Sequence, residues 1–342
     1  MFLYTQLTVF DSKYESNKIF IKVLALVTFP FVFIYMGARP LSGYYFNDMT
    51  TYNQIFEALR SYGSTALPEN DFFFYQYMLA TSKVMESEGF FLLTAFFYTL
   101  PIYVVSKKLF KKYWFYSFLL FVTSLSFWSY GTNGIRNGLA TSIFLLVFST
   151  RNLTLRILIL LLVVNIHSSM LIPALGYLIT LIVSRTTLLL YGWCLAIPVS
   201  LVGGGFFQSL FASMYKDDRT NYLTEGNVNN DVFSSTGFRW DFLAYSAIAV
   251  IIGYYFIYRK HYTDKIYHVI YGTYLIANAL WILVIKANFS NRFAYLSWFI
   301  MPLVIIYPLL NQPKTKQNHQ LVGYSVLLYF FFTFFMFISS ST

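Results

Sequence analysis

Residues 130–173 read YGTNGIRNGLATSIFLLVFSTRNLTLRILILLLVVNIHSSMLIP. Two apolar runs separated by a basic turn occupy most of this stretch. Arg136 lies where the first run begins, and His167 lies where the second run breaks before Pro173. A guanidinium costs about 2.5–3.5 kcal/mol at the centre of an inserted helix, so it normally faces a watery cavity or a partner. The stretch therefore predicts membrane-spanning segments whose ends carry functional polar side chains.

The composition of the whole chain is that of a polytopic membrane protein. Of its 342 residues, 57% are hydrophobic and only 11% are charged, whereas about a quarter of the residues in a soluble domain are charged. The single cysteine, Cys194, excludes an intramolecular disulfide and a cysteine-based metal cluster. We expect an all-α fold that forms one integral membrane domain over residues 1–342.

Segments of about 20 apolar residues are long enough to cross a bilayer, and shorter segments suffice where a helix is broken. We predict about 11 transmembrane helices of this kind, some of them short or broken. They cover approximately residues 19–37, 89–106, 113–130, 137–150, 155–168, 170–184, 186–206, 242–258, 266–285, 293–310 and 321–338.

The lysines and arginines indicate how these segments cross the membrane. Threading the chain with its N-terminus inside collects 15 of the 24 basic residues on one face, with only three of the 14 acidic ones. The positive-inside rule makes this face cytoplasmic. The net charge of +10 therefore reports orientation and does not indicate nucleic-acid binding. The two long connections, 38–88 and 207–241, then lie outside, where we expect the function.

The region around His167 could form one overlong helix or two short ones. One helix would place the basic run at 259–265 outside, against the positive-inside rule. Pro173 removes a backbone donor and disfavours helical geometry at the residue before it. We therefore predict two short helices, broken near 165–169, with His167 close to their outer ends.

The common enzyme signatures are missing. The sequence contains no phosphate-binding glycine loop, no dinucleotide fingerprint and no zinc-protease or serine-hydrolase motif. We predict no metal and no cofactor, because the adjacent Asp217 and Asp218 present too few oxygen ligands for a cation site.

Cationic and carboxylate side chains gather instead on the predicted outer side. Arginine binds phosphate oxygens bidentately through a planar fork and stays charged, so this set indicates an oxyanion substrate. Its members are Arg39, Asp48, Arg136, His167, Arg219, Arg239, Asp241 and Arg292.

Each of these residues also has a plainer interpretation. The arginines could pair with loop carboxylates, His167 could be a structural hydrogen-bond donor, and Asp48 could merely form a turn. Tyr52 and its aromatic neighbours could stack on sugar rings or lie in the aromatic belt of the membrane. The aromatic run at residues 72–77 is predicted to form an interfacial helix.

Two segments of the sequence carry recognisable motifs. An Arg-x-Gly-Leu-Ala element at 136–140 is followed by an Ile-His-x-Ser element at 166–169. Looser elements lie at residues 39–52, 88–90 and 291–295. In this order the elements resemble the EpsG-like branch of the bacterial polysaccharide polymerases, the Wzy-type proteins.

The resemblance implies a GT-C-like, metal-independent glycosyltransferase of the bacterial inner membrane, with a cytoplasmic N-terminus and a site facing the periplasm. It implies polymerisation of undecaprenyl-pyrophosphate-linked repeat units into O-antigen, capsular polysaccharide or exopolysaccharide. An O-antigen ligase, or a flippase or transporter of lipid-linked oligosaccharide, is the alternative. The implied partners are the lipid-linked oligosaccharides as donor and acceptor, the lipid bilayer and a chain-length regulator, without nucleic acid.

The resemblance also implies roles for individual side chains. The implied catalytic residues are Asp48, Arg136 and His167. The implied substrate-binding residues are Arg39, Tyr52, Asn137 and Arg292. Arg219, Arg239 and Asp241 are predicted to bind substrate from their place on the predicted outer side.

Overall fold

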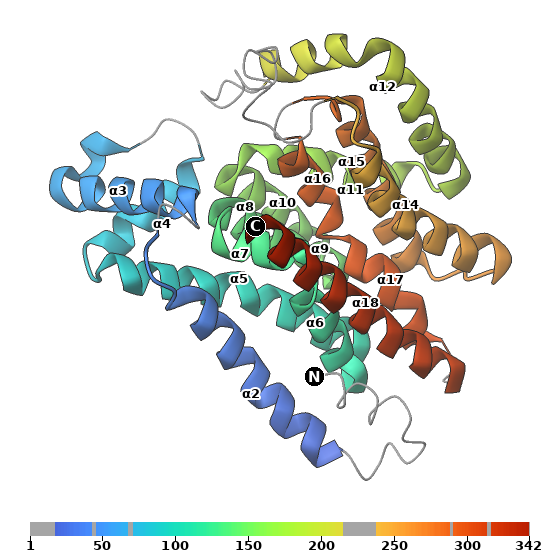
Figure 1. Ribbon diagram of the computed structural model, residues 1–342, viewed down its shortest axis with the longest axis horizontal. Helices are drawn as coiled ribbons and strands as arrows, with labels where there is room; N and C mark the ends of the chain where they lie inside the picture. Colours follow the sequence, from blue (N-terminus) through green and yellow to red (C-terminus); the bar gives the residue numbers. More distant parts are fainter. Residues whose placement is uncertain are drawn as a thin grey trace. The chain divides into compact units, whose positions relative to one another are not determined.

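The structure is a computed structural model that describes residues 18–42, 46–67, 71–214, 237–287, 290–312 and 316–341. Every regular element within these ranges is a helix, and Figure 1 shows the helices in chain order from blue to red. The prediction of an all-α polytopic membrane protein is confirmed.

Among the described residues, six helical segments are long and apolar enough to cross a membrane, judged by length and composition. Four shorter apolar helices accompany them. The six long segments are Ser87–Val122, Thr186–Leu210, Trp240–Arg259, Lys265–Leu283, Asn291–Asn311 and Gln320–Ile338. The shorter ones are Val23–Gly37, Ile135–Ser149, Leu153–Ile166 and Ser168–Ile182.

Three of the predicted spans, 113–130, 137–150 and 293–310, are each divided between two helices. The stretch 113–130 forms α6 (Trp114–Val122) and α7 (Leu125–Thr132). Ser124 lies between them, and its hydroxyl donates to the Phe121 carbonyl over 2.7 Å. Hydroxyl side chains that bond nearby carbonyls compete with the helical hydrogen bonds. α7 is therefore a separate short helix directly ahead of the Arg136 motif.

The chain divides into two compact units. Unit 1 comprises residues 1–167 together with 306–342, and unit 2 comprises residues 168–305. The boundary falls at the predicted break, because α10 (Leu153–Ile166) ends there and α11 (Leu171–Ile182) begins after a short turn. The prediction of two short helices in this region is confirmed.

Unit 1 is built around α5 (Ser87–Phe110), which packs against α2 (Lys18–Gly37), α6 and α8 (Ile135–Phe144). α8 also packs against α7 and α10. The unit also contains α9 (Leu146–Ser149), α18 (Lys316–Ser341) and the second half of α17 (Met301–Asn311). Fully buried aromatic rings fill much of this core.

The predicted loop 38–88 contains two helices, α3 (Asn47–Tyr62) and α4 (Phe72–Ser82), which pack against each other. The first two aromatic residues of α4 are exposed, whereas Phe74 and Tyr75 are buried. One side of α4 therefore belongs to the protein core. Its location at a membrane interface stays a prediction.

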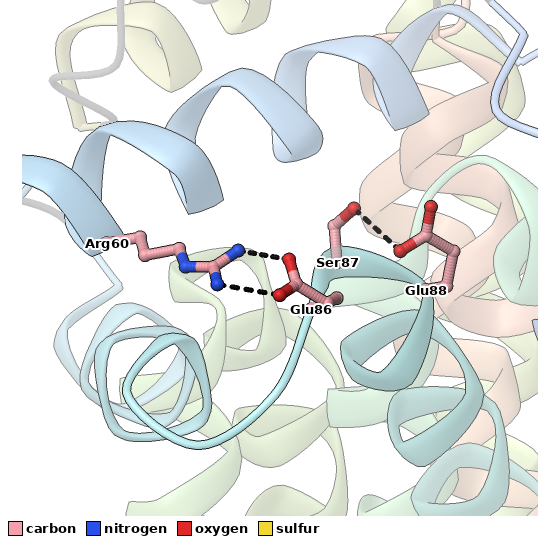
Figure 2. A network of polar contacts seen from close by, with 4 residues as sticks. All are labelled: Arg60, Glu86, Ser87 and Glu88. Atoms are coloured by element: carbon pink, nitrogen blue, oxygen red, sulfur yellow. Dashed lines mark hydrogen bonds and ion pairs between the residues drawn. The ribbon is translucent and has the colours of Figure 1, made fainter.

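A surface ion pair connects α3 with the start of α5. Figure 2 shows the guanidinium of Arg60, near the end of α3, facing both carboxylate oxygens of Glu86, which directly precedes α5. The hydrogen bond from Arg60 lowers the pKa of the Glu86 carboxyl. Both side chains are exposed, so water screens the pair and it contributes little to stability.

Gly138 allows a close approach between α7 and α8. A Cβ atom at this position would lie 2.7 Å from the carbonyl oxygen of Tyr130, closer than real Cβ atoms come. The glycine of the Arg-x-Gly-Leu-Ala element thus serves helix packing directly beside Arg136.

Unit 2 is built around α15 (Lys265–Leu283). This helix packs against α11, α12 (Thr186–Met214), α14 (Trp240–Tyr254) and α16 (Asn291–Trp298). Its buried side is rich in tyrosine, and the tyrosine hydroxyls donate to carbonyls of neighbouring helices. This bonding satisfies the hydroxyls without water.

A buried amide holds the helices of unit 2 together. Oδ1 of Asn278 accepts from Nε1 of Trp193 over 2.7 Å, and Nδ2 of Asn278 donates to the hydroxyls of Ser246 and Ser297. Nε1 of Trp298 also donates to the Ser246 hydroxyl. Polar bonds of this kind join helices where the surroundings are apolar. The network connects α12, α14, α15 and α16.

Candidate functional site

Three ionisable side chains meet inside unit 1. Nη1 of Arg136 lies 2.8 Å from Oδ2 of Asp71, and Nδ1 of His167 lies 3.9 Å from the same oxygen. The side chains of Asp71 and Arg136 are 2% and 5% exposed, and that of His167 is 11% exposed. We call these three residues the Asp71 cluster. Charges this well shielded from water interact strongly, and each would be costly to bury alone.

Tyr75 belongs to the immediate surroundings of Arg136. Nη1 of Arg136 donates to the Tyr75 hydroxyl over 2.9 Å, and the guanidinium carbon lies 5.6 Å from the centre of the ring. The same nitrogen, Nη1, therefore contacts both Asp71 and Tyr75. The guanidinium is thereby held in one orientation.

Each member of the Asp71 cluster comes from the end of a different helix. Asp71 directly precedes α4, Arg136 lies in the first turn of α8, and His167 directly follows α10. α10 packs against both α4 and α8, which brings the three helix ends together. Helix ends leave backbone groups unpaired, so polar side chains are accommodated there within an otherwise apolar bundle.

The backbone of Asp71 adopts the left-handed conformation, with φ 55° and ψ 49°. Aspartate and asparagine tolerate this region better than most residues. An aspartate before a helix usually accepts a hydrogen bond from the first turn. Asp71 makes no such side-chain bond to α4, and its carboxylate pairs with Arg136 instead. Tertiary pairing has replaced helix capping at this position.

The turn between α7 and α8, residues 132–136, is contacted from the first predicted outer region at three places. Arg39 donates to the carbonyl of Thr132. The backbone N–H of Asp48 donates to Oδ1 of Asn133 over 3.1 Å. The third contact is the Asp71 cluster itself. The structure therefore brings four predicted site residues around one turn. They are Arg39, Asp48, Arg136 and His167.

Arg39 is partly enclosed where α2 ends. Its guanidinium also donates to the Met36 carbonyl and lies 5.3 Å from the centre of the Phe46 ring. Burial lowers the pKa of Arg39 to about 10, so the side chain remains a cation at neutral pH.

Two further predicted residues lie in unit 1. Tyr52 is buried, and its ring centre lies 5.6 Å from that of Phe74, so it packs between α3 and α4. Asn137 follows Arg136 on α8 and is half-buried. Substrate binding by either residue stays a prediction.

The remaining described candidates lie in unit 2. Nε and Nη2 of Arg239 donate to the two carboxylate oxygens of Asp241 over 2.9 and 2.6 Å. The Arg239 guanidinium also lies 3.6 Å from the centre of the Phe242 ring. Arg239 therefore pairs with a nearby carboxylate, which is the alternative to substrate binding that the sequence left open for the arginines. Arg292 is the second residue of α16 and is half-buried.

Arg219 and the adjacent pair Asp217 and Asp218 lie outside the described residues. The predicted loop 207–241 begins inside α12, which continues to Met214. Within the part of the chain that the structure describes, no group of three or more His, Cys, Asp or Glu side chains is arranged to hold a metal ion.

Sequence reasoning missed two members of this site. Asp71 is one of only 14 acidic residues and stands directly before an aromatic helix, which was the available signal. Tyr75 belongs to the run expected at the membrane interface, but the structure buries it against Arg136. Neither position carries a recognisable motif in sequence.

Comparison with known proteins identifies a family for nearly the whole chain. Residues 22–342 match the family described as the EpsG family. The matched range includes every residue of the Asp71 cluster. No curated protein and no solved structure matches the chain.

Proposed function

Because the chain belongs to the EpsG family, which is of the polysaccharide-polymerase type, we propose that it polymerises lipid-linked oligosaccharide repeat units by glycosyl transfer. The growing chain on undecaprenyl pyrophosphate is the donor, and an incoming lipid-linked repeat unit is the acceptor. The product is an O-antigen, a capsular polysaccharide or an exopolysaccharide. A chain-length regulator is a further partner in this proposal.

The observation that supports this proposal best is the Asp71 cluster. Ionisable side chains inside a membrane protein are expensive and are usually associated with a substrate path or a reaction. Here three of them meet at helix ends, beside a turn that also contacts Arg39 and Asp48. An enzyme that transfers a polar sugar at a membrane surface needs such a polar region.

The proposed reaction breaks the bond between the anomeric carbon and the pyrophosphate oxygen of the donor. Negative charge develops on the pyrophosphate as this bond breaks, and arginines placed beside it would stabilise that charge. Within unit 1, Arg39 is a half-buried arginine with the chemistry for this role. A general base takes the proton of the acceptor hydroxyl. No metal ion takes part in the proposed reaction.

The proposed location is the bacterial inner membrane, with the N-terminus in the cytoplasm and the site facing the periplasm. The distribution of basic residues supports this orientation, because 15 of the 24 lie on the face assigned to the cytoplasm. Lipid-linked repeat units reach the outer face only after they have been flipped, so the proposed reaction follows flipping.

A deletion strain tests the proposal. Loss of a polymerase leaves flipping and final transfer intact, so the surface should carry a single repeat unit and no ladder of longer chains. Complementation with the wild-type gene should restore the ladder. Electrophoresis of surface polysaccharide, together with analysis of lipid-linked intermediates, measures both.

Two other phenotypes would contradict the proposal and identify the alternatives. Lipid-linked polymer that accumulates without any attached unit would indicate an O-antigen ligase. Single lipid-linked units trapped on the cytoplasmic side would indicate a flippase or transporter.

A further inference from the structure

We propose that Asp71 is a positioning residue of this site, which holds His167 with its proton on Nδ1 so that Nε2 accepts the proton of the acceptor hydroxyl. The same carboxylate fixes the orientation of Arg136. This inference rests on the proposed function and assigns the role of base within it.

One carboxylate oxygen of Asp71 faces both other members of the cluster. Oδ2 of Asp71 lies 2.8 Å from Nη1 of Arg136 and 3.9 Å from Nδ1 of His167. An Nδ1–H group that faces a carboxylate is attracted to it, whereas an Nδ1 lone pair in the same place is repelled. A carboxylate near one ring nitrogen thus selects the tautomer of a histidine. Little water is present to screen this preference, because Asp71 is 2% exposed.

The proposal places the acceptor hydroxyl at the histidine. His167 is the most exposed member of the cluster at 11%, compared with 5% for Arg136 and 2% for Asp71. In the proposal the substrate hydroxyl contacts the histidine, and Asp71 acts through it. The position of His167 directly after α10 also places the ring at a helix end.

In the proposed glycosyl transfer, the O–H bond of the acceptor breaks and its proton passes to Nε2 of His167. The acceptor oxygen forms a bond to the anomeric carbon, and the bond from that carbon to the pyrophosphate oxygen breaks with its electron pair on the leaving group. The imidazolium that forms is stabilised by the Asp71 carboxylate beside Nδ1. Release of this proton to water returns the site to its starting state.

The most informative substitution is Asp71→Asn. Asparagine tolerates the left-handed backbone at φ 55° as aspartate does, so the variant removes the charge without adding backbone strain. Glu86→Gln is the matched control, because it also removes a carboxylate that pairs with an arginine, but on the exposed surface.

The first measurement reads the tautomer directly. The full-length protein, labelled with 15N-histidine and reconstituted in lipid nanodiscs, gives signals for its four histidines, and His167→Gln identifies the one of interest. At a pH where the ring is neutral, we expect His167 of the wild-type protein to carry its proton on Nδ1. The Nε2–H form should increase in Asp71→Asn and remain unchanged in Glu86→Gln. A wild-type proton on Nε2, or the same tautomer in all three proteins, would overturn the inference.

The second measurement is polymer formation in the complemented deletion strain. At equal protein level, we expect Asp71→Asn to lower polymer yield about 100-fold, since correct general-base catalysis contributes on the order of 10²–10⁴. Glu86→Gln should give a normal ladder. Wild-type polymer from Asp71→Asn would overturn the inference. Absence of polymerase activity in the wild-type protein would refute the proposed function and, with it, the proton transfer to Nε2 of His167. The tautomer measurement does not depend on that activity.

Asp71→Asn leaves Arg136 as a buried charge, which could prevent folding. The double variant Asp71→Asn with Arg136→Gln removes both charges and avoids this problem. We expect this double variant to form no polymer, but its His167 signal still reports which ring nitrogen carries the proton. A proton that remains on Nδ1 in the folded double variant would contradict the role given to Asp71.

Discussion

Oδ2 of Asp71 lies 2.8 Å from Nη1 of Arg136 in a place that water hardly reaches. Removing one partner of such a buried pair leaves the other as an uncompensated charge, at a cost of about 3–5 kcal/mol. The pair also connects the start of α4 with the start of α8. Substitutions here therefore act on folding and on the candidate site together, and the two effects need separate measurements.

Arg136→Lys should preserve the folded protein and abolish long polymer. Lysine keeps a positive charge near Asp71, but it lacks the rigid planar guanidinium, whose Nη1 contacts both Asp71 and Tyr75, and the donors at Nε and Nη2. Arg136→Ala should destabilise the protein by about 3–5 kcal/mol, because Asp71 is then buried alone. Thermal unfolding in detergent separates the two variants, and surface polysaccharide reports activity. A full ladder from Arg136→Lys would show that the guanidinium is dispensable.

Gly138→Ala should destabilise unit 1. The added Cβ would meet the Tyr130 carbonyl oxygen at 2.7 Å, and overpacking of this kind costs about 1–3 kcal/mol. Gly205→Ala in α12 is the matched control, because a Cβ there meets no atom within 4 Å. The melting temperature should fall for the first variant and not for the second. Equal melting temperatures would argue against the close approach of α7 and α8.

Asn278→Ala should destabilise unit 2. The substitution leaves the indole N–H of Trp193 buried without its acceptor, which costs about 1–3 kcal/mol. Asn165→Ala is the control, since that amide is exposed and bonds only to the Leu161 carbonyl of its own helix among the contacts that the structure describes. Thermal unfolding measures both, and the result would be contradicted by similar melting temperatures.

The proposed orientation predicts the outcome of reporter fusions. Fusions after Lys108 and after Lys260 should report a cytoplasmic location, because both lie in basic connections. Fusions after Thr65 and after Asn229 should report a periplasmic location. Alkaline phosphatase activity for the Lys108 fusion would reverse the proposed topology.

The sequence by itself determined the architecture of this protein. Helices occupy each of the eleven predicted stretches, although 113–130, 137–150 and 293–310 are each divided between two helices. Apolar length and basic connections are local properties, so they can be read along the chain. The break after α10 was also predictable, because Pro173 acts on its immediate neighbours and the basic connections downstream can be counted along the chain.

Only the tertiary structure decided which side chains meet. Arg136 and His167 stood out in sequence, since each interrupts an apolar run. Their common neighbour Asp71 did not, because a carboxylate before a helix ordinarily caps that helix. The packing of α10 against α4 and α8 places Asp71 between them, and that packing depends on helix surfaces far apart in the chain. A buried charge is paired by three-dimensional proximity, which no local pattern records.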